Sequence, residues 1–153
     1  MDQVRLILDA ESHLPDPRVH ALLIGLAADP AGHDLARIEC MKILRLSAPS
    51  GPAVWQQAGR AVASALREDD ELVRQFAAMS LGPYAQDEVV FDALALAALH
   101  DEDVNVRYNA VAAIAEAGPS DRNAGLLRRL ADDPEVGNAA ARVLTGWNHG
   151  VSR

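Results

Sequence analysis

Apolar residues recur at helical spacing along the chain, and the pattern is clearest in its third quarter. The stretch from Asp87 to Leu99 holds good helix formers whose apolar members recur about every 3.6 residues. A second helix is expected from Asp103 to Glu116, and the pair Gly118-Pro119 follows it as a stop signal. Because no stretch alternates apolar and polar residues as a strand does, the pattern predicts an all-α chain. The apolar residues of the first helix are Val89, Val90, Leu94, Leu96, Ala97 and Leu99.

This helical pair is one copy of a repeat. The segment 66–77 recurs 33 residues later as 99–110, and weaker copies of the same turn and helix lie on both sides. A fixed period of this length indicates a supersecondary unit that is copied and stacked. We therefore expect one domain over residues 1–153, an α-solenoid of about four antiparallel helix pairs in a right-handed superhelical stack. The expected units cover residues 16–46, 52–82, 87–117 and 120–146.

The register of the repeat predicts which residues form the core. Ala77, Ala110 and Ala140 occupy equivalent positions, and Cys40 holds that position in the first unit. In the third unit one face of the second helix is formed by small and branched apolar residues, which must point inward. These inward residues are Val106, Ala110, Ala113 and Ile114.

The two clearest copies share the motif Asp-x-x-Val-Arg-x-x-Ala, which begins at Asp70 and again at Asp103. In this motif and period the chain resembles HEAT-like repeats, in particular the short bacterial kind found in phycobilisome-lyase relatives. The resemblance implies a stack in which the second helices line a concave side. It also implies a lyase-related or enzyme-accessory protein as one possible function.

The composition of the chain limits the classes of partner that it can bind. The formal net charge of −8, from 14 basic and 22 acidic residues, argues against nucleic acid, because phosphate binding needs a concentrated basic surface. No apolar run reaches the length of a membrane span. The stretch from Met1 to Arg5 lacks the layout of a signal peptide, and Cys40 is the single cysteine, so we expect a cytoplasmic protein.

Acidic residues gather at the turns between the two helices of each unit. A carboxylate there caps a helix start and interacts favourably with the helix dipole. Asp70 and Asp103 also precede Arg74 and Arg107 by four residues, a spacing that favours ion pairs. We therefore expect these four residues to form a structural ladder along the stack, which Arg37 extends into the first unit. Each guanidinium can reach a turn carboxylate of its own unit or of the next, and such ion pairs would bind one unit to another. Alternatively, the turns form an acidic ridge that attracts a basic partner.

The polar face of each second helix predicts a binding surface. The register aligns Asn105, Tyr108 and Asn109 with equivalent residues in the other units, and we expect Tyr108 and Asn109 to be exposed. Phe76 and Met79 either contribute anchors to a protein-binding groove or lie in the core. The complete predicted surface consists of Ile38, Lys42, Gln75, Phe76, Met79, Asn105, Tyr108, Asn109, Asn138 and Arg142.

No hydrolase, metalloprotease, phosphate-loop or dinucleotide motif occurs in the sequence. We therefore expect no enzyme activity, no cofactor and no metal. The sequence predicts a protein-binding scaffold or adaptor that uses the concave face. An immunity or inhibitor protein that neutralises a basic toxin or nuclease is an alternative, while the oligomeric state stays open.

Overall fold

The computed structural model describes residues 5, 7 and 16–151 of the chain. The described part contains eight α-helices and two short 3-10 helices, and no strand. Every helix from Pro17 onward belongs to one of four consecutive antiparallel pairs. The helices are α2 (Pro17–Ala28), α3 (Asp34–Leu46), α4 (Pro52–Ser64), η1 (Ala65–Arg67), α5 (Glu71–Met79), η2 (Gly82–Tyr84), α6 (Glu88–His100), α7 (Val104–Ala117), α8 (Asp121–Leu130) and α9 (Gly137–Val151).

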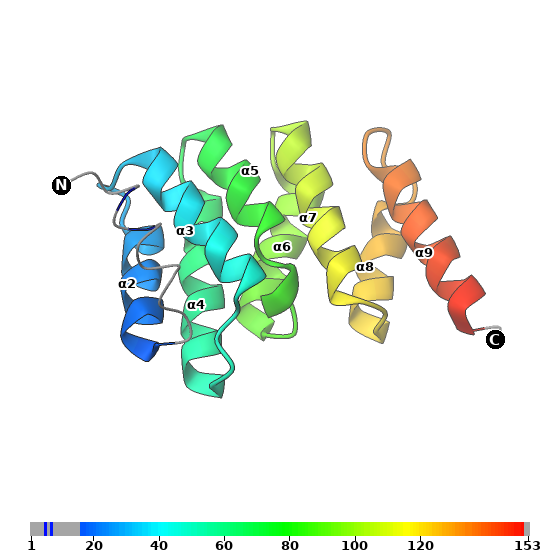
Figure 1. Cartoon of the computed structure of the whole chain (residues 1–153). Helices are drawn as coiled ribbons and strands as arrows, with labels where there is room; N and C mark the ends of the chain where they lie inside the picture. The colour runs from blue at the N-terminus through cyan, green and yellow to red at the C-terminus, as the bar shows by residue number, and fades with distance from the viewer. Residues whose placement is uncertain (1–4, 6, 8–15, 152–153) are drawn as a thin grey trace.

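The pairs stack side by side into an α-solenoid, with α2 and α9 at opposite ends (Figure 1). The first helix of each pair contacts the first helices of the neighbouring pairs, and the second helices do the same. We call α2, α4, α6 and α8 the first-helix layer, and α3, α5, α7 and α9 the second-helix layer. The all-α fold class and the solenoid are thus as predicted.

The core lies between the two layers, and its residues confirm the predicted register. Ala77, Ala110, Ala140 and Cys40 are all completely buried, although the units that hold them diverge in sequence. The predicted inward face of α7 is buried along its whole length. Small side chains at the repeated position let neighbouring second helices approach closely, which is why the alanines recur.

Short polar side chains start the helices. The carboxylates of Asp70, Asp87 and Asp103 accept hydrogen bonds from backbone N–H groups in the first turns of α5, α6 and α7. Ser120 caps α8 by accepting from the N–H of Asn123. These bonds satisfy donors that a helix start leaves without a partner.

The helix ends agree with the prediction at one site and differ at another. Gly118 ends α7 with a φ of 91°, a conformation that glycine adopts without strain. By contrast, α5 ends earlier than expected, at Met79, and Gly82 lies in η2. A Cβ on Gly82 would lie 2.6 Å from Cδ of Glu116, so glycine is needed there for a close approach to α7.

The expectation that the chain lacks a signal peptide rests mainly on residues 1–4, which lie outside the described residues. Of the helices that the structure describes, none has both the length and the apolar character needed to cross a bilayer.

Candidate functional site

Three buried arginines run along the second-helix layer at equivalent positions. Arg37, Arg74 and Arg107 have relative exposures of only 2%, 7% and 8%. Each guanidinium donates to backbone carbonyl oxygens between the two helices of its own unit or at the end of the first, for example from Arg107 Nε to Ala98 O at 2.9 Å. These hydrogen bonds hold the turn between the two helices of each unit in place.

The same guanidinium groups form ion pairs with the next unit of the stack. Arg74 Nε lies 3.1 Å from Asp101 Oδ2, and Arg37 pairs with Glu68 in the same way. The arginines therefore join successive units, which is one of the two pairings that the sequence left open. Asp70 and Asp103 accept hydrogen bonds from N–H groups at the starts of their own helices.

The fourth turn is shorter, and there one carboxylate serves both purposes. Asp133 accepts from the N–H groups of Glu135 and Val136 and also pairs with Arg107. The hydrogen bond from Arg107 and these N–H groups lower the pKa of Asp133 to about 2. The ladder stops at this unit because Gly137 replaces the arginine, and a Cβ on Gly137 would lie 2.5 Å from Ala131 O.

Three residues of the predicted concave surface form a second set of contacts between units. Gln75 donates through Nε2 to Asp103 Oδ1 at 3.2 Å. Asn109 donates through Nδ2 to Gln75 O at 2.9 Å, and the Tyr108 hydroxyl donates to Glu135 O at 2.6 Å. Tyr108 is exposed as expected, with 43% of its surface accessible, whereas Asn109 is only partly exposed. These polar side chains therefore join neighbouring units of the stack.

The remaining residues of that predicted surface differ in their exposure to solvent. Ile38 was expected at the surface and is buried, with 4% exposure. Its equivalents Gln75 and Tyr108 both reach toward the next unit, so this position points along the stack, and an apolar residue there becomes covered. Phe76 and Met79 are half-buried. Lys42 pairs with Glu39 on its own helix at 3.0 Å, and Asn105, Asn138 and Arg142 are exposed.

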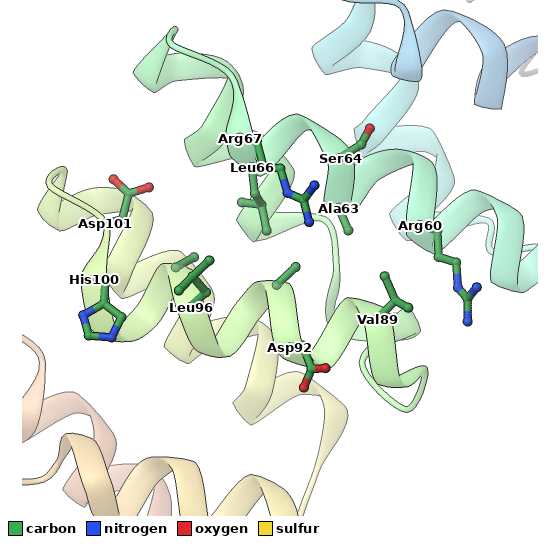
Figure 2. Close-up of a pocket in the computed structure, with 12 residues that line it drawn as sticks. Arg60, Ala63, Ser64, Leu66, Arg67, Val89, Asp92, Leu96, His100 and Asp101 are labelled. Atoms are coloured by element: carbon green, nitrogen blue, oxygen red, sulfur yellow. The ribbon is translucent and has the colours of Figure 1, made fainter.

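A groove lies in the opposite layer, between α4 and α6, where the sequence pattern did not predict one. It has a volume of about 700 Å³. Figure 2 shows Ser64, Leu66 and Arg67 on the side of α4 and η1, facing Leu96 and His100 on α6. The other lining residues are Arg60, Ala63, Val89, Asp92, Ala93, Ala97 and Asp101.

The exposed residues of α6 include two large apolar side chains, which distinguishes this helix from α4. Val89 and Leu96 lie seven residues apart on one side of α6, and 45% and 61% of their surfaces are exposed. The exposed residues of α4 are mainly polar (Gln56, Gln57, Arg60 and Ser64).

Comparison with known families agrees with this architecture. A family model described as HEAT repeats matches residues 59–145, which is more than half of the chain. The chain belongs to the HEAT-repeat family. No curated protein and no solved structure matches it. HEAT repeats are commonly protein-interaction scaffolds, so the family agrees with the prediction of a protein-binding function. The match does not assign the chain to the phycobilisome-lyase type of HEAT repeat.

Charged groups around the groove of this HEAT-repeat chain fall into two kinds. Arg60 is neutralised, because its Nε lies 3.1 Å from Oδ2 of the buried Asp87. The hydrogen bond from Arg60 lowers the pKa of Asp87 despite the burial of that carboxyl group. Arg67 and Asp92 are exposed and form no ion pair within the part of the chain that the structure describes. These two charges are available to a bound molecule.

The chemistry of the HEAT-repeat stack gives no sign of a reactive centre in its described part. Burial raises the pKa of the Cys40 thiol to about 12, so the nucleophilic thiolate is not populated near neutral pH. Within residues 5, 7 and 16–151, no group of His, Cys, Asp and Glu residues is arranged to hold a metal ion.

Proposed function

We propose that this HEAT-repeat chain is a non-enzymatic protein-binding scaffold and that the groove between α4 and α6 holds its partner. The observation that carries the proposal is the pair of exposed apolar side chains on α6, Val89 and Leu96, which line a hollow of about 700 Å³. Exposed apolar surface that is rimmed by polar groups is typical of protein interaction sites. Arg60, Arg67 and Asp92 supply such a rim here.

The second-helix layer supports this function indirectly. The buried arginines and the contacts of Gln75 and Tyr108 join each unit to the next, so the stack is a fixed platform. A preorganised surface loses little conformational freedom when a partner binds. The exposed residues Asn105, Asn138 and Arg142 offer a second contact area on this layer.

A capture experiment tests the proposal. The full chain is immobilised and exposed to a lysate of its source cells, in parallel with a Leu96→Glu variant and a Leu46→Glu control. Leu46 is 79% exposed on α3 and is therefore matched in chemistry and accessibility. We expect specific partners to be retained by the wild type and the control and lost from Leu96→Glu. Retention of the same proteins by Leu96→Glu, or the absence of any specific partner, would contradict the proposal.

A basic partner is a second candidate, which corresponds to an immunity or inhibitor protein. Its support is that Asp69, Glu102 and Asp132 are exposed at successive turns, although Glu102 also lies 3.8 Å from Arg74 Nη2. Charges of one sign along an edge accelerate association with an oppositely charged protein. Strong salt dependence of the association rate, lost when these three residues are changed to Asn or Gln, would favour this candidate.

A further inference from the structure

We propose that the ion pair between Arg45 and Glu116 is a strap that fixes the first and third units of the stack relative to each other, across the second unit. Arg45 belongs to α3 and Glu116 to α7, and Arg45 Nε lies 3.3 Å from Glu116 Oε2. Every other ion pair between units in the described part of the chain joins consecutive units. Repeats of a solenoid normally contact only their neighbours, so this pair is an addition to the common plan.

The strap crosses the stack at the end of α5, the shortest helix of the second-helix layer. α5 has nine residues, whereas α3 has 13 and α7 has 14. The repeat register places Gly82 at the position that Arg45 holds in the first unit. A Cβ on Gly82 would lie 2.6 Å from Cδ and 2.9 Å from Cβ of Glu116. The side chain of Glu116 therefore lies directly on the backbone of Gly82, and any side chain at that position would displace it.

The short helix η2 beneath the strap is held from both sides. It carries Tyr84, whose side chain is completely buried. The Tyr84 hydroxyl donates to the carbonyl oxygen of Leu44, which precedes Arg45 on α3. At the start of η2, Glu116 of α7 covers Gly82. The ends of α3 and α7 therefore both contact η2, and the strap joins these two ends to each other.

The close packing of Glu116 explains how a partly exposed ion pair can act as a strap. The side-chain exposures of Arg45 and Glu116 are 36% and 37%. Ion pairs at a surface usually contribute little, partly because two long side chains must be ordered in one geometry. Glu116 is already held against Gly82, so it loses less conformational freedom when Arg45 pairs with it.

The fourth unit lacks the residues that an equivalent strap would need. In the register that aligns Ala110 with Ala140, Gly146 takes the place of Glu116. Because Gly82 already takes the place of Arg45, both ends of such a pair would be glycine. The first three units should therefore form one rigid block, to which the fourth unit is joined only through the third. This inference is independent of what the groove binds.

A double-mutant cycle measures whether the two charged side chains act together. Urea unfolding is followed for the full chain, Arg45→Gln, Glu116→Gln and the double variant. We expect a coupling of about twofold to fivefold in the unfolding equilibrium constant, which disappears at about 1 M salt. In Gly82→Ala the added Cβ displaces Glu116, so the same cycle should show no coupling. No coupling in the wild-type background, or an equal coupling in Gly82→Ala, would overturn the inference.

Distances between spin labels test whether the pair fixes the two units. Nitroxide labels are attached at Leu46→Cys on α3 and Ala112→Cys on α7, two exposed positions, while Cys40 is buried. We expect the distance distribution, measured by electron paramagnetic resonance, to broaden in Glu116→Gln. Lys42→Gln is the matched control, because Lys42 forms an ion pair of similar exposure within α3. An unchanged distribution in Glu116→Gln, or equal broadening in Lys42→Gln, would contradict the role of the strap.

Discussion

The exposed side chains of the two helix layers differ in their contacts. In the second-helix layer, Gln75, Tyr108 and Asn109 lie on the outward polar face and are bonded from one unit to the next. In the first-helix layer, Val89 and Leu96 of α6 stand uncovered beside a groove. Polar residues at a surface therefore do not by themselves mark a binding face, and here they stabilise the stack.

The first-helix layer also has contacts between its units, but they lie on the flanks of the helices. Arg60 pairs with Asp87, and Trp55 donates through Nε1 to Pro83 O at 3.1 Å. On the other side of α6, the Arg122 guanidinium lies 4.2 Å from the centroid of the Phe91 ring. These contacts fix α6 between its neighbours and leave its outward face free. The comparison therefore predicts that stability and binding depend on different residues.

Loss of a ladder arginine should break the stack most severely. In Arg74→Ala, the buried Asp101 loses its partner and the carbonyl groups of Glu68 and Asp69 lose their donors. Removing one partner of a buried ion pair costs about 3–5 kcal/mol. Urea unfolding followed by circular dichroism measures the change. The control Arg129→Ala removes an exposed arginine and should stay within about 0.5 kcal/mol. Equal stabilities of the two variants would refute the structural role of the ladder.

A pair of glycine variants probes the packing within the first-helix layer. A Cβ on Gly59 of α4 would lie 2.7 Å from Cβ of the buried Tyr84, so Gly59→Ala should destabilise the chain by about 1–3 kcal/mol. Gly25 of α2 has no neighbour within 4 Å of such a Cβ, and Gly25→Ala should stabilise the chain by about 0.5–1 kcal/mol. Thermal unfolding distinguishes the two. Changes of the same sign would mean that α4 is not packed against Tyr84.

Acid should weaken the last contact of the ladder. The pKa of Asp133 is about 2 in the folded chain and about 3.9 in an unfolded one. Its contribution to stability is therefore complete above about pH 4 and is lost as the pH falls toward 2. The lowered pKa of Asp87 acts in the same direction. Urea midpoints as a function of pH should fall less steeply in Asp133→Asn than in the wild type. An equally steep fall would contradict the assignment, and the exposed neighbour in Asp132→Asn serves as the control.

The fold could be predicted from the sequence because equivalent positions in successive repeats can be compared with one another. Ala77, Ala110 and Ala140 identify the core face, since one register explains all three positions. The sequence left open whether each arginine pairs within its own unit or with the next, and the structure pairs Arg74 with Asp101 of the next unit. A register shows which residues are equivalent, but it does not show whether Arg74 reaches within its unit or beyond it.

The groove beside α6 was not predicted, because periodicity marks apolar residues as inward. Leu96 satisfies the helical spacing of a core residue, although 61% of its surface is exposed. Ile38 shows the reverse case, in which an equivalent position becomes buried because its side chain points along the stack.

The central claim is that one layer holds the stack and the other binds, and one paired measurement tests it most directly. Thermal stability and retention of partners from lysate are measured for Leu96→Glu and Tyr108→Phe side by side. We predict that Leu96→Glu keeps its stability within about 0.5 kcal/mol and loses its partners. Tyr108→Phe should lose about 0.5–1.5 kcal/mol, because its hydroxyl no longer donates to Glu135 O, and keep its partners. Loss of partners from Tyr108→Phe, with binding intact in Leu96→Glu, would contradict the account.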